Sequence, residues 1–465
     1  MWGIILQPNC EVGLARQIFL AFQERIITGQ LGAGETLPST RELSKGLGVS
    51  RNTVCEAYDM LFTEGFIVSR QGAPTRVAEG LHIRHAEEQK QHPPAQTKAG
   101  NPPVVWDFQT GRPDLSLFPW QQWSQALRSA ADTLPIRELG YRSPKGYEPL
   151  CAEIASWLLR KRGMDVDAAN VYITAGATQA LHLLVNLLHR NGCAFATEAP
   201  SHPGIHTVLL DKEYPIHLMP VDGQGADVSS LEGAAISAAY VTPSHQFPVG
   251  GILPASRRAE LIRLAKKQDF FIVEDDYDSE FRYSGAPVSP VYCLDPSRVA
   301  YVGTFSKTLF PALRLGFAVL PKALQEGFLH ARTYLDVQNP ILEQAALAEF
   351  LRTRKMDRHV QHMCRIYGER RNILLRSIEN TFGSSARCHG DASGMHVALQ
   401  MSGMEFGEVF VEISRKAGIR VNPLWRYCGV EHGYRDMLLL GYAHLTLDQI
   451  ESGVAALRRV IASEL

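Results

Sequence analysis

The sequence predicts a multidomain protein in which a small N-terminal winged helix-turn-helix precedes a large α/β body. Residues 8–78 contain three short helical patterns, followed by two short strand patterns separated by a turn. Beyond Trp106, short apolar runs alternate with longer helical patterns, which is typical of a mostly parallel sheet with crossover helices. The length of 465 residues also fits several domains.

The composition excludes several classes of protein. The chain is 45% hydrophobic and 20% charged, as folded globular proteins are, and it has no apolar stretch long enough to span a bilayer. Its first residues lack the basic segment of a secretory signal. The eight cysteines show no Cys-x-x-Cys pair or other metal-ligand spacing. We therefore expect no membrane association, no metal site, reduced thiols and a cytoplasmic location.

Three helices are expected in the N-terminal region. The first is predicted by apolar residues at near-helical spacing, namely Leu14, Ile18, Phe22 and Ile26. Ser39 and Glu42 have the spacing of a capping box, which predicts the start of the second helix. Ser50 is a candidate N-cap for the third helix. The inward face of that helix would hold Val54, Ala57, Tyr58 and Leu61. Residues 66–77 then predict a two-stranded wing.

This arrangement predicts DNA binding, with the polar start of the third helix in the major groove. Residues 1–80 hold seven Arg or Lys against eight Asp or Glu, so the prediction rests on the placement of single arginines. Guanidinium groups match phosphates and guanine edges. The candidate contacts are Arg41, Arg51, Arg70 and Arg76. In the alternative interpretation, the three helices only pack together and these arginines are solvated.

Residues 79–104 are predicted to form a flexible linker between the head and a body that spans residues 105–465. The segment is polar, rich in Gln, Lys, His and Pro, and free of apolar periodicity. Such a tether would let head and body move relative to each other. The composition is equally compatible with an insertion that has no mechanical role.

Chemically useful residues follow the apolar runs of the body, and ligands of parallel sheets bind at the carboxyl ends of strands. Gly176 precedes a predicted helix whose free N–H groups can hold a phosphate. Asp275 can pair with a pyridine nitrogen, and Tyr277 can form a hydrogen bond with a phenolic oxygen. Taken singly, a tight turn and solvated acids explain these residues equally well.

Lys307 is a candidate for imine formation, provided that desolvation or neighbouring cations lower the pKa of its amine. Thr304 and Arg314 lie close to it in sequence. Most lysines have no such role, but the combination of a helix start, an acid, a phenol and a lysine at strand ends is specific. Together these residues supply each group that pyridoxal 5'-phosphate needs, so the sequence predicts a site for that cofactor.

The run LPSTRELSKGLGVSRNTVCEAYDMLFTEGFI resembles the winged helix of GntR-type bacterial transcription regulators. The resemblance implies that the polar residues at the start of the second and third helices contact DNA, and that the wing near Gly72 lies along the minor groove. The implied contacts are Arg41, Arg51, Asn52 and Thr53. The wing tip departs from the usual ending of that family by carrying an Ala-Pro-Thr-Arg sequence at residues 73–76.

The body resembles the fold-type I, pyridoxal-phosphate-dependent transferases of the aminotransferase class, which implies an α/β domain with a C-terminal α+β small subdomain. By this resemblance Lys307 forms the Schiff base, Asp275 binds the pyridine nitrogen and Tyr277 binds the phenolic oxygen. The resemblance also implies a homodimer in which a tyrosine crosses to the partner's phosphate. The implied phosphate ligands are Thr304, Arg314, Ala177, Thr178 and, from the partner, Tyr141.

The body departs from the catalytic members of this class around the cofactor ring. Phe247 stands where the family has an asparagine, so His245 or Gln246 would supply the missing polar contact. His202 falls where an aromatic ring stacks on the cofactor, and histidine stacks less broadly than tyrosine.

The residue that would bind an effector carboxylate is ambiguous. Arg426 and Arg435 both lie in the C-terminal region where the family has such an arginine, and residues 438–442 lack the usual one. The effector is therefore left open between an amine and an amino acid.

The order of head, linker and body, together with the run TFSKTLFPALRLG, resembles the MocR/GabR subfamily of bacterial regulators. The resemblance implies a regulator that senses a small amine or amino acid by aldimine exchange at Lys307 and reports it to operator DNA. It also implies that the aminotransferase-like domain serves sensing and not turnover. Two alternatives stay open: an active aminotransferase with a fused DNA-binding head, and a sensor of pyridoxal phosphate itself.

Overall fold

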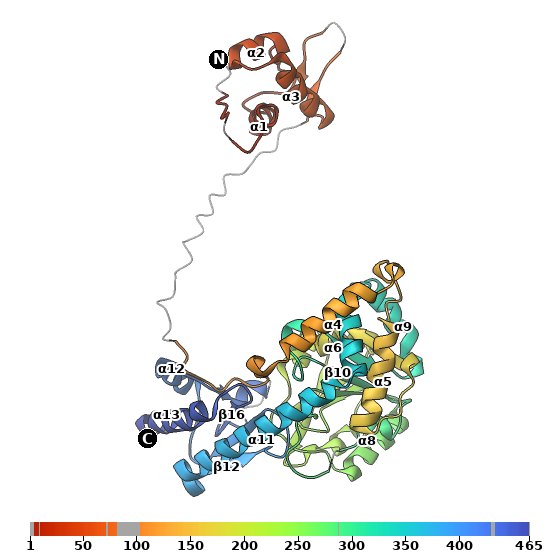
Figure 1. Ribbon diagram of the computed structural model, residues 1–465, viewed down its shortest axis with the longest axis vertical. Helices are drawn as coiled ribbons and strands as arrows, with labels where there is room; N and C mark the ends of the chain where they lie inside the picture. Colours follow the sequence, from red (N-terminus) through yellow and green to blue (C-terminus); the bar gives the residue numbers. More distant parts are fainter. Residues whose placement is uncertain are drawn as a thin grey trace. The chain divides into compact units, whose positions relative to one another are not determined.

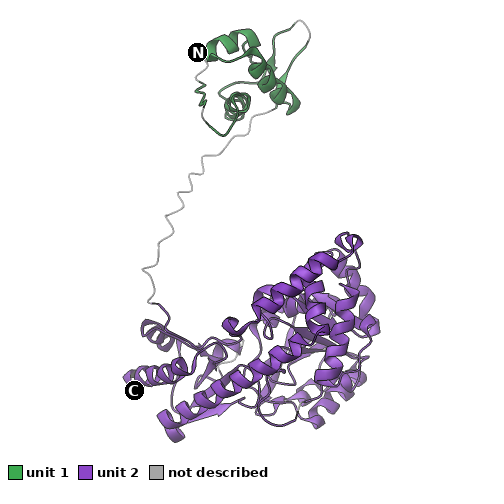
Figure 2. Ribbon diagram, in the orientation of Figure 1, with its two compact units in different colours: residues 1–98 green, residues 99–465 purple. Residues whose placement is uncertain are grey.

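The computed structural model describes residues 4–8, 10–70, 73–80, 103–286, 288–428 and 433–464. The chain divides into two compact units, Met1–Lys98 and Ala99–Leu465, which Figure 2 colours separately. Apart from its ends, the linker predicted for residues 79–104 lies outside the described residues. Each unit is described by itself below.

The N-terminal unit contains the predicted helices and wing. Its elements are α1 (Leu14–Ile27), α2 (Thr40–Leu47), α3 (Arg51–Thr63), β1 (Ile67–Val68) and β2 (Arg76–Val77). The capping box is confirmed, because the Ser39 hydroxyl accepts from the Glu42 amide and the Glu42 carboxylate accepts from the Ser39 amide. Ser50 caps α3, and the apolar faces of the three helices close a small core against the antiparallel β1–β2 pair.

The body is built on an eight-stranded sheet in the order β4-β11-β10-β9-β8-β5-β6-β7. The central strands run parallel, as the sequence predicts, whereas β11 and β7 run antiparallel to their neighbours. The strands are β4 (Val171–Thr174), β5 (Ala194–Ala199), β6 (Ile216–Asp222), β7 (Gly225–Ala226), β8 (Ile236–Val241), β9 (Phe271–Asp276), β10 (Val299–Thr304) and β11 (Gly316–Val319).

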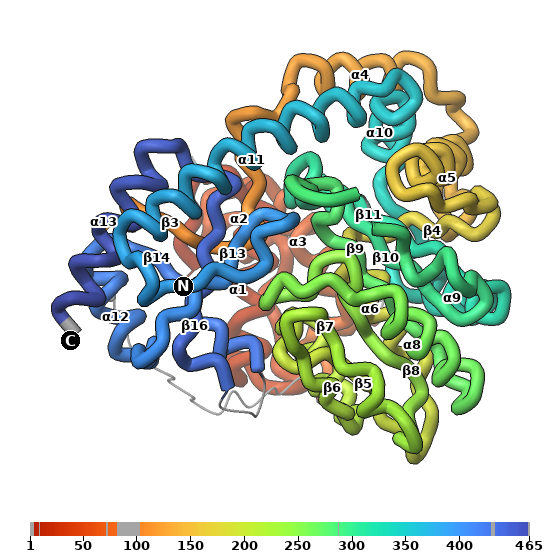
Figure 3. The backbone as a smooth tube through the Cα atoms, turned by 90° about the horizontal axis from the view of Figure 1, so that it is seen from below, coloured from red at the N-terminus to blue at the C-terminus, as the bar shows by residue number. Residues whose placement is uncertain are grey.

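Helices cover both faces of this sheet (Figures 1 and 3). Strand β10 shows the alternation: Val299 and Tyr301 join the core on one face, and Ala300 and Val302 join the core on the other. The first face packs against α4 (Trp120–Thr133), α5 (Glu148–Arg162), α8 (Ala255–Gln268) and α10 (Ile341–Arg352). The second packs against α6 (Gly176–Leu187), α7 (Pro203–Leu210) and α9 (Lys322–Thr333).

Strand β9 is longer than its apolar run suggests. The strand includes three consecutive acids after Val273 and continues through Asp276. All three acids are buried and each has hydrogen-bond donors, which is what allows carboxylates inside a sheet. The donors are the Val291 and Tyr292 amides for Glu274, the Tyr240 hydroxyl for Asp275, and Arg162 with the Tyr301 hydroxyl for Asp276.

A C-terminal α+β subdomain completes the body and confirms the predicted fold class. Its antiparallel sheet has the order β12-β13-β16-β15 and has its own hydrophobic core. The strands are β12 (Ala386–His389), β13 (His396–Met401), β15 (Asn422–Pro423) and β16 (Met437–Gly441). The helices are α12 (Glu408–Lys416) and α13 (Leu447–Glu464), and β14 (Ile419–Arg420) pairs with β3 (Trp106–Asp107).

One long helix, α11 (Lys355–Phe382), joins this subdomain to the large one: it packs against α10 at one end and α13 at the other (Figure 3). Within the described residues, none of the helices combines the length and the hydrophobicity that crossing a membrane requires.

Candidate cofactor site and DNA-binding face

A cavity of about 250 Å³ opens at the carboxyl ends of β8, β9 and β10 and the start of α6. Parallel pairing brings these ends together, since Gly303 of β10 lies opposite Asp276 of β9. The side chains predicted to bind one cofactor thus meet in one place. The predicted residues that line the cavity are Ala177, Thr178, His202, Asp275, Tyr277, Thr304, Lys307 and Arg314.

Lys307 lies just after β10, and its Nζ donates a 2.7 Å hydrogen bond to the carbonyl oxygen of Gly111. Burial lowers the pKa of its amine, and Arg314 lowers it further, while Asp278 and Asp275 act in the opposite direction. A lowered pKa increases the fraction of amine that carries a free lone pair. That is the condition which imine formation sets on a lysine.

Asp275 has one carboxylate oxygen engaged and one unused. The Tyr240 hydroxyl donates to Oδ2 at 2.7 Å, whereas Oδ1 is buried and has no hydrogen-bond partner among the described residues. Burial raises the pKa of Asp275 to about 6 against the effect of Tyr240. A cationic N–H group in the cavity would satisfy Oδ1 and favour the ionised carboxyl.

The start of α6 forms the anion-binding end of the cavity. The backbone of Ala177 and Thr178 belongs to the first helical turn, whose N–H groups have no partner within the helix. Arg314 lies over this turn, and its Nη2 donates to the Ala175 carbonyl at 2.7 Å. Gly176 permits the approach: its φ is +77°, and a Cβ there would lie 3.0 Å from the Arg314 guanidinium. Thr304 lines the same cavity.

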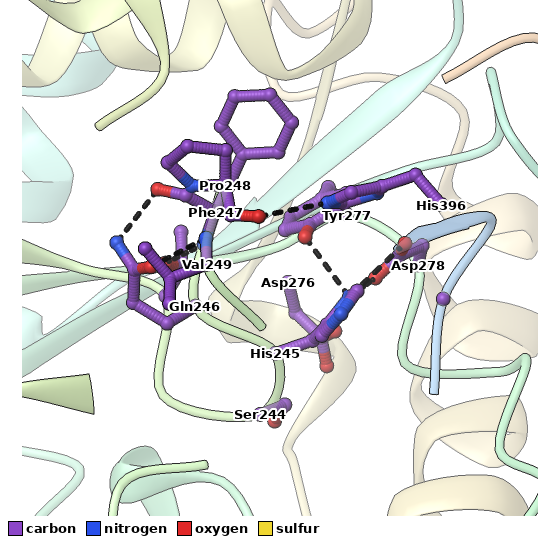
Figure 4. Close-up of polar contacts among 12 residues, drawn as sticks. Ser244, His245, Gln246, Phe247, Pro248, Val249, Asp276, Tyr277, Asp278 and His396 are labelled. Atoms are coloured by element: carbon purple, nitrogen blue, oxygen red, sulfur yellow. Dashed lines mark hydrogen bonds and ion pairs between the residues drawn. The ribbon is translucent and has the colours of Figure 1, made fainter. Parts of the chain in front are cut away.

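Tyr277 follows β9 and also lines the cavity, but its hydroxyl already has a protein neighbour (Figure 4). Its oxygen lies 3.0 Å from Nδ1 of His245, and that nitrogen lies 3.0 Å from a carboxylate oxygen of Asp278. Gln246 is turned away, because its amide donates to the Pro200 and Phe247 carbonyls. Of the two residues expected to replace the missing asparagine, His245 therefore contacts the hydroxyl group of Tyr277, whereas the side-chain amide of Gln246 is bound to backbone carbonyls.

His202, predicted to stack on the cofactor ring, lies beside the cavity. His202 caps α7 and accepts the Gly204 amide on Nδ1 at 3.0 Å, which fixes its ring beside the cavity. The Phe247 ring lies 5.5 Å from it and is tilted by 59°. Phe247 also lines the cavity, so the residue in place of the asparagine contributes an apolar wall.

Three predicted residues lie away from this cavity. Tyr141 is 90% exposed, in the segment that follows a short 3-10 helix. Arg426 pairs with Glu408 at 2.5 Å, and Arg435 pairs with Glu405. None of the three is among the residues that line the cavity, so the roles proposed for them stay predictions, as do those of the lining residues.

Sequence reasoning missed several residues of the cavity. Tyr240 is an apolar-looking member of β8, and only the strand order puts its hydroxyl beside Asp275. Ser306 precedes Lys307, and its amide donates to the Thr304 hydroxyl at 3.2 Å. His396 comes from β13 of the small subdomain, and burial lowers the pKa of its imidazole to about 3. Of these, only Ser306 carries a local signal, its position next to the lysine.

The predicted DNA-binding residues lie on the head. The side chains of Arg41, Arg51, Asn52 and Arg70 are exposed. Thr53 is half-buried, and its hydroxyl lies 2.8 Å from that of the N-cap Ser50, so part of its bonding capacity serves the helix. The predicted wing tip at Gly72 lies outside the described residues.

Comparisons with known proteins agree with this division. Residues 14–77 match the bacterial regulatory proteins of the gntR family, and residues 105–457 match aminotransferase class I and II. The "Probable rhizopine catabolism regulatory protein MocR" of Rhizobium meliloti is 30% identical over 98% of this chain and 95% of its own length. The chain belongs to the MocR-type transcriptional regulators. Another relative is the "HTH-type pyridoxine biosynthesis transcriptional regulator PdxR" of Corynebacterium glutamicum, 30% identical over 92% of this chain and 91% of its own.

For this MocR-type chain, the solved structures agree with the body's fold. The kynurenine aminotransferase of Pyrococcus horikoshii, in complex with PMP, matches with a TM-score of 0.72 and 25% identity over 78% of this chain and 92% of its own. Membership of the aminotransferase class makes the body a pyridoxal-phosphate fold. The residues of its cavity fit that group. Oδ1 of Asp275 can accept from the pyridine nitrogen, the start of α6 can bind the phosphate, and the amine of Lys307 can react with the aldehyde.

Proposed function

We propose that the protein regulates transcription by binding operator DNA through its head and by sensing a small amine or amino acid in the cavity of its body. Bound pyridoxal phosphate would supply an aldehyde there. Lys307 would hold that aldehyde, and an incoming amine would take the place of Lys307. The single observation that carries the proposal is that Lys307, with its lowered amine pKa, and the unused Oδ1 of Asp275 line one cavity.

The chain's own residues account for how the exchange would be registered. When Lys307 is released, its free amine lies close to Asp278 and Asp275, the two acids that raise its pKa against the effect of burial. Lys307 also bonds to the Gly111 carbonyl, in the segment that joins β3 of the small subdomain to α4 of the large one. Release of Lys307 can therefore alter the contacts at the junction of the two subdomains. The protein would then have two states that differ in these contacts.

A homodimer is part of this proposal. One small winged helix makes few base contacts, so two heads on paired half-sites would be needed for specific binding. The exposed Tyr141 would reach the phosphate of the partner's cofactor. Because the regulator acts on DNA, we place it in the cytoplasm of a bacterial cell.

A second candidate, an active aminotransferase with a DNA-binding head, is favoured by the fold of the body. The regulator names of the relatives lean against it. A third candidate is a sensor of pyridoxal phosphate alone, in which no amine is needed. Measuring turnover distinguishes the aminotransferase from our proposal. Adding the cofactor before the amine distinguishes the cofactor sensor.

The experiment uses the full chain loaded with pyridoxal phosphate and a DNA fragment selected by the protein from a random pool. Small amines and amino acids are screened by the visible absorbance of the bound cofactor. Each compound that changes the absorbance is then tested for its effect on the footprint. We expect the footprint to change only when cofactor and amine are both present.

Lys307→Ala and Lys307→Arg serve as matched variants, since arginine keeps the charge but forms no imine under these conditions. Both should lose the visible band and the amine response while the head still binds DNA. A footprint that changes with cofactor alone would support the cofactor sensor instead. Multiple turnovers of keto acid from the active amine and 2-oxoglutarate would support the enzyme.

A further inference from the structure

Three side chains form a buried hydrogen-bonded series beside the cavity: Asp278, His245 and Tyr277 (Figure 4). Nδ1 of His245 lies 3.0 Å and 3.3 Å from the two Asp278 carboxylate oxygens and 3.0 Å from the Tyr277 hydroxyl oxygen. The His245 and Asp278 side chains are 1% and 2% exposed. One ring nitrogen is therefore shared between a carboxylate and a phenol, away from solvent.

The carboxylate decides which atom carries the proton. An ionised carboxyl only accepts hydrogen bonds, so Nδ1 of His245 must be protonated to face Asp278 at 3.0 Å. A protonated ring nitrogen has no lone pair to offer. The Tyr277 oxygen can therefore accept from His245 but cannot donate to it, and this holds for the neutral and the charged ring alike.

The hydroxyl proton of Tyr277 is thus free for another acceptor. Burial, with Asp278 adding to it, raises the pKa of Tyr277 well above its ordinary value, so the proton stays on the phenol. Tyr277 lines the cavity, so a ligand bound there can accept that proton in a hydrogen bond. The side chain of Phe247, at the position where an asparagine would have donated, offers no hydrogen-bonding group.

The small subdomain holds the series in place. Gly394, just before β13, lies so close that a Cβ on it would be 2.1 Å from Cε1 of His245 and 2.7 Å from Oδ2 of Asp278. The Gly394 carbonyl accepts the Tyr283 hydroxyl at 2.7 Å and the Tyr442 hydroxyl at 2.8 Å, which fixes that backbone. The orientation of His245 thus depends on both subdomains.

We infer that Asp278 and His245 act as positioning residues that hold Tyr277 as a hydrogen-bond donor to an acidic oxygen on the ligand in the cavity. On the function proposed above, that oxygen is the phenolic oxygen of pyridoxal phosphate. Asp278 and His245 then act through Tyr277 in place of the asparagine that Phe247 replaces. A ligand without an oxygen acceptor at this point gains nothing from the series.

The test has a readout that needs no cofactor. In the ¹⁵N-histidine spectrum of the cofactor-free chain, the signal lost in His245→Asn identifies His245, and we expect its Nδ1 to be protonated. An unprotonated Nδ1 would overturn the inference, whatever the cofactor does. This separates its failure from that of the proposed function, which a wild-type chain unable to bind pyridoxal phosphate would reveal.

The second readout is the pH midpoint of the visible band of the bound cofactor. A donor to the phenolic oxygen competes with the nitrogen that joins Lys307 to the cofactor, so losing the donor raises that nitrogen's pKa. We expect His245→Ala to raise the midpoint by about one pH unit, a tenfold change in proton affinity. Tyr277→Phe should raise it at least as much.

A double-mutant cycle distinguishes positioning from general damage. His245→Ala should add little in a Tyr277→Phe background, because the donor is already gone. His245→Asn, whose amide nitrogen can donate to Asp278 in place of Nδ1, should restore most of the wild-type midpoint. Full additivity, or an unchanged midpoint in His245→Ala, would overturn the inference. Denaturant unfolding of each variant shows whether its body is intact.

Discussion

The hydroxyl of Tyr240 donates a 2.7 Å hydrogen bond to Oδ2 of Asp275, while Oδ1 of the same buried carboxyl has no hydrogen-bond partner among the described residues. Tyr240 is fully buried in β8 and Asp275 lies near the end of the adjacent β9. The phenol thus holds one carboxylate oxygen and leaves the other without a partner in a residue that lines the cavity. Burial also raises the pKa of Asp275 to about 6, which makes its charge depend on pH near neutrality.

This pKa predicts how cofactor binding depends on pH. The folded-state pKa of about 6 lies above the unfolded value near 3.9, so in the empty protein this carboxyl loses native-state stability as pH rises between them. A pyridinium N–H reverses that loss by pairing with the ionised carboxyl. We expect cofactor affinity to fall by up to about tenfold per pH unit below about 6. Equilibrium titrations at pH 5 and pH 7.5 measure this difference.

Asp275→Asn is the matched variant, since it keeps the shape of the side chain and removes the charge. We expect it to weaken cofactor binding at pH 7.5 by about 1.5–3 kcal/mol, the range for a hydrogen bond to a charged group. Its affinity should change less between the two pH values than that of the wild type. An equal change in both proteins would contradict the assignment of the pH dependence to Asp275.

Gly394→Ala should disturb the cofactor site although residue 394 belongs to the small subdomain. Its φ is +83°, and the added Cβ would overlap the His245 ring and Asp278. Gly403→Ala is the control: its φ is +84°, but nothing lies within 4 Å of the added atom. We expect Gly394→Ala to cost about 1–3 kcal/mol more in unfolding free energy than the control, measured by denaturant titration.

The two substitutions should also differ in the spectrum of the bound cofactor. Gly394→Ala displaces His245, so the pH midpoint of the visible band should move in the same direction as in His245→Ala. Gly403→Ala should leave it where the wild type has it. A shift of equal size in both variants would indicate a general effect of backbone strain.

Arg51→Ala should weaken binding to the selected DNA by about 1–3 kcal/mol without altering the absorbance of the cofactor. The side chain is exposed at the first position of α3, and its Nε donates a long 3.4 Å hydrogen bond to the Thr40 hydroxyl, so little of the fold depends on it. Arg51→Lys separates two kinds of contact: lysine keeps a phosphate contact but loses the fork that reads guanine. Unchanged affinity at matched salt in both variants would remove Arg51 from the interface.

Tyr141 is predicted to serve the partner's cavity, and mixed dimers can test this. Tyr141→Phe should reduce cofactor affinity roughly tenfold, the order of one hydrogen bond to a charged phosphate. When Tyr141→Phe and Lys307→Ala chains are mixed and allowed to exchange, one cavity of the mixed dimer has both wild-type residues. Tight binding should return at about half the sites of such dimers. Failure to recover, in a mixture shown to contain mixed dimers, would place Tyr141 outside the site.

Much of the cofactor site could be predicted from the sequence because parallel sheets bring strand ends together. Lys307, Asp275 and Thr304 each lie just beyond or within the end of an apolar run, and the fold needs only the right strand order to gather them; Arg314 lies just before β11. The capped helices of the head could be predicted for a different reason. A capping box and a 3.6-residue apolar period are local signals that tertiary packing has no cause to overrule.

The sequence by itself determined which chemical groups lie at the strand ends and which helices form the head, because both depend on neighbours along the chain. Only the tertiary structure decided how those groups are oriented: Tyr240 beside Asp275, His245 between Asp278 and Tyr277, and Gly394 packed against His245. These contacts join residues far apart in the chain, and their geometry is set by strand order and by the docking of the small subdomain. No local pattern records the side on which a buried side chain meets its neighbour.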